Sequence, residues 1–131
     1  MRAERLHLTL HFIGEVEQEH AARLADALPA PTAPFQLSLQ RNDLWPHGIA
    51  VLEPETVPSG LTELQAALGE LLRAHALPVD QRSYKPHVTL ARRAAGALPG
   101  ADGPLIHWQV DRYALVQSRA GLHEVLRETM L

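Results

Sequence analysis

Two short stretches of the chain, eighty positions apart, repeat the same alternation of polar and apolar residues. They read HLTL and HVTL and begin at His7 and His87. Such alternation is typical of a half-buried β-strand, because successive side chains of a strand point to opposite faces of the sheet. His7 and Thr9 therefore share one face of the first strand, and His87 and Thr89 share one face of the second. The pattern predicts two strands that each carry an imidazole and a hydroxyl side by side.

These paired groups suit acid–base chemistry at phosphorus. Histidine has an ordinary pKa of about 6.5, so one copy can be neutral while the other is protonated at the same pH. One imidazole can then take a proton from water while the other gives a proton to a leaving oxygen. A threonine hydroxyl can donate to a non-bridging phosphate oxygen. We therefore interpret His7, His87, Thr9 and Thr89 as catalytic residues around one phosphodiester. The alternative is that the two pairs are simply the exposed polar faces of edge strands.

Composition narrows the class of protein. A chain of 131 residues predicts one domain, residues 1–131. The absence of cysteine excludes disulfides, thiol nucleophiles and thiolate metal sites. A net charge of −3 does not fit a protein that coats nucleic acid through charge alone. The chain has no apolar run of membrane-spanning length and no apolar secretory segment at its amino terminus, so we expect a cytoplasmic protein without a membrane partner.

The remaining periodicity predicts helices and strands in alternation. Apolar residues at helical spacing predict helices over residues 17–28 and 58–75. Strands are expected at 35–40, 49–52, 106–110, 113–117 and 124–130. A turn is expected at 44–48, and a glycine-rich loop is expected at 94–104. A motif strand together with a helix is predicted twice along the chain. This order predicts two similar halves whose histidine strands face each other across a groove.

The two motifs resemble the paired His-x-Thr-x motifs of the two-histidine (2H) phosphoesterase superfamily. The sequence FIGEV after the first motif and the pair Ala91-Arg92 after the second are similar to its branch of RNA 2′,3′-cyclic phosphodiesterases, also called 2′-5′ RNA ligases. Residues 115–118 and 124–126 are similar to the carboxyl-terminal hairpin of that branch. The resemblance implies an α+β fold with two pseudo-symmetric lobes of mainly antiparallel sheet, outer helices and an active-site groove between the lobes.

One departure from the family concerns the amino terminus. Family members usually carry a strand and a helix before the first motif, whereas only six residues precede His7 here. An absent strand would leave a sheet edge exposed, so we expect a homodimer through that edge or a rearranged segment that covers it. A misassigned start codon is the other explanation.

The resemblance also implies a reaction. It is the metal-independent hydrolysis of a terminal 2′,3′-cyclic phosphate, on RNA or a nucleotide, to a 2′-phosphomonoester, with reverse 2′-5′ RNA ligation by the same groups. His87 would activate the water, His7 would protonate the departing 3′ oxygen, and Thr9 and Thr89 would hold the non-bridging oxygens. No cofactor is expected.

Further residues are expected to bind the substrate. The resemblance implies a phosphate contact for Arg92, although a regular strand would turn Arg92 away from His87, so a bulge or twist is needed. Tyr84 and Lys85 lie close to the expected site entrance, and His11 falls on the face of His7. Trp45, beside Arg41, is either a base-stacking platform or a lid on the core.

Two other functions remain open from the sequence. His7, His11 and His87 could ligate a divalent metal ion in a metal-dependent hydrolase, since three imidazoles can form an open catalytic zinc site. The protein could instead be a module that binds RNA ends or nucleotides without turnover.

Overall fold

The structure, a computed structural model, describes residues 7–80, 82–91 and 106–131. Its residue contacts divide the chain into two compact units. Unit 1 consists of Met1–Leu10, Gln36–Pro58 and Arg82–Trp108, and unit 2 consists of His11–Phe35, Ser59–Gln81 and Gln109–Leu131.

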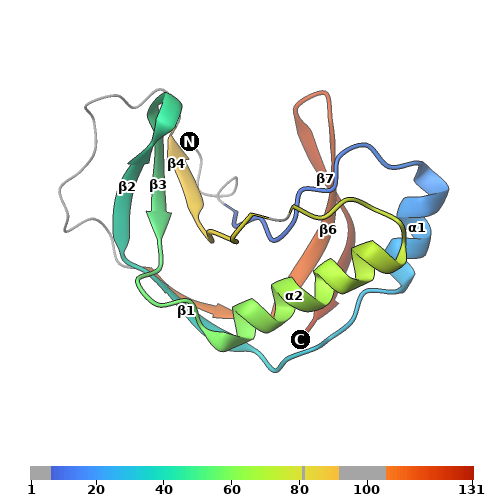
Figure 1. Ribbon diagram of the computed structural model, residues 1–131, viewed down its shortest axis with the longest axis horizontal. Helices are drawn as coiled ribbons and strands as arrows, with labels where there is room; N and C mark the ends of the chain where they lie inside the picture. The colour runs from blue at the N-terminus through green and yellow to red at the C-terminus, as the bar shows by residue number, and fades with distance from the viewer. Residues whose placement is uncertain (1–6, 81, 92–105) are drawn as a thin grey trace. The chain divides into compact units, whose positions relative to one another are not determined.

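Helices and strands are both present, and the three-stranded sheet and the carboxyl-terminal hairpin are antiparallel, so the predicted α+β class is confirmed (Figure 1). The elements are, in chain order, α1 (Gln18–Asp26), β1 (Phe35–Leu39), β2 (Arg41–Trp45), the short 3-10 helix η2 (Pro46–Gly48), β3 (Ile49–Glu53), α2 (Ser59–Ala74), β4 (Val88–Ala91), β5 (Ile106–Val110), β6 (Arg112–Arg119) and β7 (Leu122–Met130). Both predicted helices form. The predicted turn is shorter than expected, because β2 continues to Trp45. The predicted loop at 94–104 lies outside the described residues.

A three-stranded antiparallel sheet in unit 1 has the order β2-β3-β4 (Figure 1). Its central strand, β3, is buried on both faces, which explains why Ile49–Leu52 is a continuous apolar run instead of an alternating one. Val51 and Leu52 are fully buried. Val51 pairs with Thr89 and Leu52 pairs with Val88. The sheet therefore holds the second motif against a core strand.

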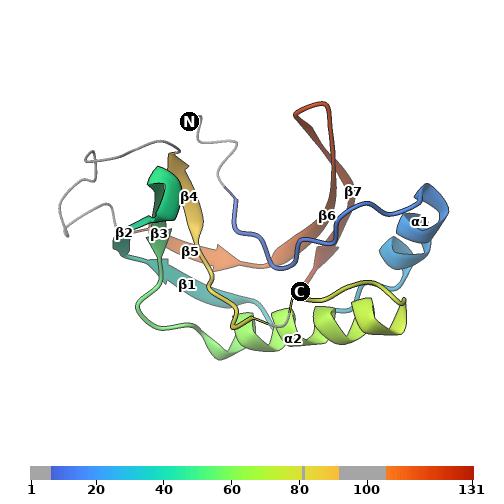
Figure 2. The same cartoon turned by 45° about the horizontal axis from the view of Figure 1, so that its top comes forward.

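The pair β1 and β5 forms a second, two-stranded sheet (Figure 2). The sequence of β1, FQLSL, alternates as predicted, and its inward residues Leu37 and Leu39 are each only 1% exposed. On the other face of the strand, the Ser38 hydroxyl lies 3.1 Å from Nδ1 of His107 in β5.

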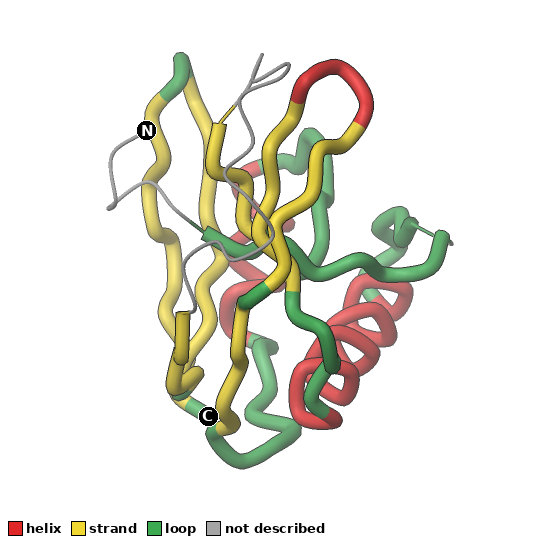
Figure 3. Tube along the Cα trace, turned by 90° about the vertical axis from the view of Figure 1, so that its left-hand side faces the viewer, coloured by secondary structure: helices red, strands yellow, loops and turns green. Residues whose placement is uncertain are grey.

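The helices of unit 2, drawn red in Figure 3, bury the apolar stripes expected from the sequence. Leu61, Leu64, Leu68 and Leu72 of α2 are buried. Near the start of α2, Gly60 lies against the ring of Phe35, where an added Cβ would come within 2.6 Å of Cδ1. Only a residue without a Cβ allows this close approach. None of the described helices has the length and apolar character needed to cross a membrane.

The strands β6 and β7 form an antiparallel hairpin in unit 2. The turn between them is Ala120-Gly121, at the predicted position, and both residues have positive φ, as a two-residue hairpin turn requires. These strands pair with each other and not with the other sheets of the described residues. The Tyr113 hydroxyl donates to the carbonyl of Pro29, and Arg127 pairs with Asp26 of α1 at 2.9 Å.

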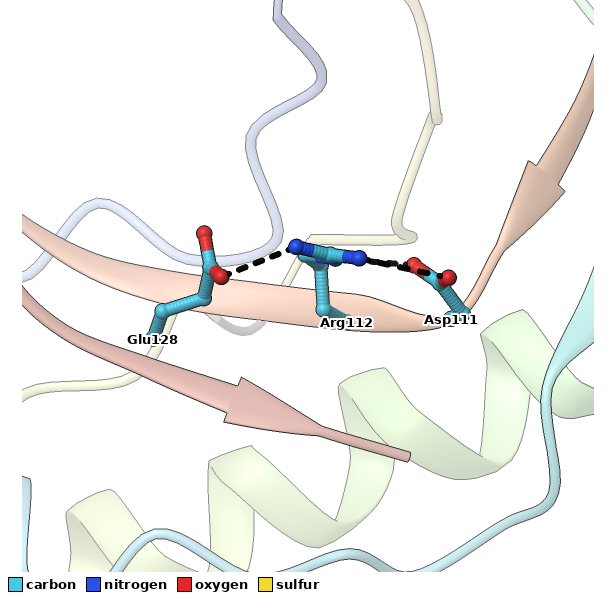
Figure 4. Close-up of polar contacts among 3 residues, drawn as sticks. All are labelled: Asp111, Arg112 and Glu128. Carbon is cyan, nitrogen blue, oxygen red and sulfur yellow. Dashed lines mark hydrogen bonds and ion pairs between the residues drawn. The ribbon is translucent and has the colours of Figure 1, made fainter.

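An ion-pair cluster lies on this hairpin (Figure 4). Arg112 donates from Nε to Asp111 at 3.0 Å and from Nη1 to Glu128 at 3.1 Å. The hydrogen bond from Arg112 lowers the pKa of Asp111. All three side chains are about half exposed to water, so we expect this cluster to contribute little to stability.

Candidate active site

Both motif segments belong to unit 1, where they are neighbours. Leu8 forms an antiparallel bridge with Val88. Continuing this register by one residue on each side places His7 opposite Thr89 and Thr9 opposite His87. All four motif side chains then share one face, opposite to that of the buried Val88. The residues predicted to act together are thus on paired segments.

The arrangement differs from the expectation in two respects. The first motif forms a single bridge at Leu8 instead of a full strand, because the chain bends at Leu10. The two motifs also lie in the same unit, not one in each half. Each half was expected to carry its own motif because a motif strand together with a helix is predicted twice. Pairing between segments, however, depends on long-range register, which local order does not specify.

A hydrogen bond to the main chain fixes the tautomer of the half-buried His87. Its Nδ1 lies 2.8 Å from the carbonyl oxygen of Lys85. A carbonyl oxygen only accepts, so Nδ1 carries the proton. In the neutral ring Nε2 then has a free lone pair, which is the state that a general base needs. The buried Pro86, between these two residues, restricts the backbone that forms this contact.

The indole of Trp45 lies against His87. The two ring centroids are 4.2 Å apart and the ring planes are inclined by 51°. Trp45 is the last residue of β2 and is half-buried. Trp45 therefore lies beside a predicted catalytic residue, which is where a base-stacking platform would have to be. The ring that the indole contacts there is the imidazole of His87.

Tyr84 connects the two motif segments. Its hydroxyl donates to the main-chain carbonyl of Thr9 at 2.9 Å. Burial raises the pKa of Tyr84, so the hydroxyl keeps the proton that makes it a donor. The contact holds the first motif beside the segment that leads into the second. Lys85, next in the chain, is exposed and uses its carbonyl for His87.

A buried carboxylate on the same sheet face was not anticipated from the sequence. The ladder pairs Thr89 with Val51 and Val51 with Asp43, so these residues share the face of the motif threonine. Arg41 lies two residues from Asp43 in β2, and Glu53 lies two residues from Val51 in β3, so both are on this same face. The two side chains form an ion pair at 3.3 Å. Glu53 is 9% exposed, and its Oε1 has no hydrogen-bond partner among the described residues. The only signal in the sequence is an acidic residue at the end of an apolar run.

The remaining predicted site residues have different outcomes. His11 belongs to unit 2, where its Nε2 donates to the carbonyl of Gln65 in α2 at 2.7 Å. A phosphate contact by this nitrogen would require that hydrogen bond to break. Arg92 lies outside the described residues. In the described part of the chain, no three His, Cys, Asp or Glu side chains gather closely enough to hold a metal ion. Of the trio His7, His11 and His87 expected in the metal-dependent alternative, His7 and His87 belong to unit 1 and His11 belongs to unit 2.

Residues 1–122 match the model of the 2′-5′ RNA ligase superfamily. The chain belongs to that superfamily. Members of the 2′-5′ RNA ligase superfamily with similar sequences include two proteins named RNA 2′,3′-cyclic phosphodiesterase. The one from Thermus thermophilus is 35% identical over 127 residues, which cover 87% of this chain and 64% of the relative. The one from Geobacillus stearothermophilus is 33% identical over 110 residues, which cover 73% of this chain and 32% of the relative. This superfamily member thus spans less than two thirds of either relative.

The fold of this superfamily member is also similar to a solved one. The structure of E. coli LigT complexed with 3′-AMP superposes with a TM-score of 0.84 at 27% identity, over 99% of this chain and 79% of that one. The resemblance inferred from the two motifs is therefore confirmed at the level of family and fold.

Proposed function

We propose that this protein hydrolyses the terminal 2′,3′-cyclic phosphate of RNA or of a nucleotide to a 2′-phosphomonoester, without a metal ion. The observation that carries the proposal is the bridge between Leu8 and Val88, which brings the two motif segments side by side. If the antiparallel register continues on both sides of this bridge, both His-x-Thr pairs share one face. The names of the two relatives, both RNA 2′,3′-cyclic phosphodiesterases, support the same substrate class.

The reaction needs one proton acceptor and one proton donor. Nε2 of His87 takes a proton from water as the water oxygen forms a bond to phosphorus. The bond between phosphorus and the 3′ oxygen breaks, and protonated His7 delivers a proton to that oxygen. The phosphate stays on the 2′ oxygen. Each proton transfer by a positioned side chain typically accelerates a reaction by about 10²–10⁴-fold.

The threonines and the tautomer of His87 support these roles. Thr9 and Thr89 lie diagonally across the bridge, so their hydroxyls can donate to the two non-bridging oxygens as negative charge develops. The hydrogen bond from Nδ1 of His87 to Lys85 leaves Nε2 as the acceptor, which favours His87 as the base. The order of acid and base otherwise follows the family. A 5′-hydroxyl in place of water would give 2′-5′ ligation by the same groups.

Substrate contacts outside the motifs are part of the proposal. The exposed ammonium of Lys85 is available to an RNA phosphate near the cyclic end. Arg92, which follows the second motif, is proposed to contact the cyclic phosphate because the family motif places an arginine there.

The test is turnover of adenosine 2′,3′-cyclic phosphate in a chelator, with the product isomer identified by ³¹P NMR. We expect the 2′-monoester, abolished turnover in both His7→Ala and His87→Ala, and unchanged turnover in His123→Ala. His123 is an exposed histidine of β7 and serves as the matched control. Turnover that stops in chelator and returns with zinc would favour the metal-dependent hydrolase instead. Binding without any turnover would favour the binding module.

We further propose a homodimer through the β6–β7 sheet. In the described residues these strands pair only with each other, so each has one edge without a partner strand. Leu122, Val125 and Met130 of β7 are more than half exposed. Exposed apolar side chains on an unpaired edge favour association with another strand. Light scattering after size exclusion should give a dimer mass that Val125→Lys reduces to the monomer mass. A monomer at all concentrations would contradict the proposal.

A further inference from the structure

The backbone of Trp45 is constrained by strand pairing on one side and by a tight turn on the other. It ends β2, pairs with Ile49 across the hairpin, and precedes the turn Pro46–Gly48. In that turn His47 and Gly48 both have positive φ, which reverses the chain within three residues. Strand pairing on one side and this turn on the other hold the backbone of Trp45, so its side chain projects from a constrained position.

The imidazole of His87 is restrained from two directions. The hydrogen bond from Nδ1 to Lys85, at 2.8 Å, lies along the edge of the ring and sets the direction of one nitrogen. The contact with Trp45, at 4.2 Å between ring centroids, limits rotation of the ring about that hydrogen bond. The two contacts together determine where Nε2 points.

We propose that Trp45 is a positioning residue, which holds the His87 imidazole with Nε2 aimed at the phosphorus, and that Trp45 is not a platform for the nucleobase. This inference rests on the proposed function. The imidazole already occupies one side of the indole at contact distance, so a base could not stack on that side without displacing the His87 ring.

The expected effect follows from the sensitivity of proton transfer to geometry. A displacement of about 1 Å in a reacting group can cost on the order of 10²-fold in rate. Trp45→Ala should therefore lower kcat by about 10- to 100-fold with little change in KM. Trp45→Phe keeps an aromatic surface against His87 and should stay within about 3-fold of the wild type. Because both replacements are uncharged, they leave unchanged the charges of Arg41, Asp43 and Glu53, which share this sheet face, and of Lys85.

Kinetics with two substrates separates the two roles of Trp45. One substrate is adenosine 2′,3′-cyclic phosphate, and the other is 1-O-methylribose 2′,3′-cyclic phosphate, which has no base. A positioning role predicts the same loss of kcat on both substrates. A rise in KM confined to the substrate that carries a base would overturn the proposal and assign Trp45 to base stacking. Trp108→Phe, at a 39% exposed tryptophan of β5, is the control and should match the wild type.

An NMR measurement without substrate keeps this inference separate from the proposed function. The ring protons of His87, assigned with His87→Gln, should be shifted upfield by the indole ring current in the wild type. In Trp45→Ala they should move downfield, and the ¹⁵N shifts should change from one tautomer to a mixture. Unchanged His87 signals in a folded Trp45→Ala variant would refute the inference. If that variant does not fold, Trp45→Leu replaces it in the same comparison. Inactivity of the wild type would contradict only the proposed function.

Discussion

Replacing Tyr84 with phenylalanine tests the contact that joins the two motif segments. The change removes the hydroxyl that donates to the carbonyl of Thr9 at 2.9 Å and keeps the half-buried ring. A protein hydrogen bond contributes about 0.5–1.5 kcal/mol net. Thr9 is exposed, so water can hydrate the freed carbonyl, and we expect the lower end of that range. At neutral pH the variant should be less stable than the wild type by about 0.5 kcal/mol.

Alkaline pH should reverse this difference. Burial raises the pKa of Tyr84 above its ordinary value of about 10. At a pH between the ordinary pKa of tyrosine and the raised pKa of Tyr84, the folded protein keeps the phenol proton while the unfolded chain has lost it. The unfolded state then binds fewer protons, so stability falls as pH rises above about 10. This group contributes at most about 1.4 kcal/mol per pH unit, and partial exposure of the ring reduces that slope. The variant lacks this loss and should become the more stable protein by about pH 11.

The assay is urea unfolding of both proteins at several pH values from neutral to about pH 11, followed by tryptophan fluorescence. The quantity compared is the difference in the free energy of unfolding. Burial also raises the pKa of Tyr113, but Tyr113 is present in both chains and cancels in the difference. A difference that stays constant with pH, or a variant that remains the less stable protein at pH 11, would refute the reasoning.

Three further predictions concern unit 2. Gly60→Ala should lower the free energy of unfolding by about 1–3 kcal/mol, because the new Cβ would lie 2.6 Å from the Phe35 ring; an unchanged urea midpoint would contradict this contact. Ala76→Gly should raise the free energy of unfolding by about 0.5–1 kcal/mol, because Ala76 has φ +58° at the end of α2. There the amide of Leu77 donates to the carbonyl of Leu72, as in a Schellman cap, and a lower thermal midpoint would contradict the prediction. Arg112→Gln should leave the urea midpoint unchanged, because its ion pairs are exposed, and a clear loss of stability would show that they matter.

Local periodicity was sufficient for much of the fold. Both helices appear where apolar residues recur at helical spacing, and the alternation in FQLSL correctly places Leu37 and Leu39 inside. The same alternation places each motif histidine on the face of its threonine. These features depend on neighbours within a few residues, so the sequence carries them directly.

Strand pairing and long-range side-chain contacts could not be predicted from local periodicity. The first motif forms one bridge instead of a strand, His11 donates to Gln65 of α2, and Trp45 lies against His87. Each of these contacts joins residues more than forty positions apart. The local sequence pattern does not indicate which residues come into contact at such separations, because strand register and packing across the whole unit determine those contacts.

By itself, the amino-acid sequence determined the chemistry available to this protein: two imidazoles and two hydroxyls in matching pairs, without thiols, in a member of the 2′-5′ RNA ligase superfamily. Only the tertiary structure decided that the pairs lie across one bridge, that the main chain holds the tautomer of His87, and that the buried Glu53 shares their face. The physical reason is that residue type and spacing are local properties, whereas the distance between two side chains far apart in the chain is set by how the whole unit packs.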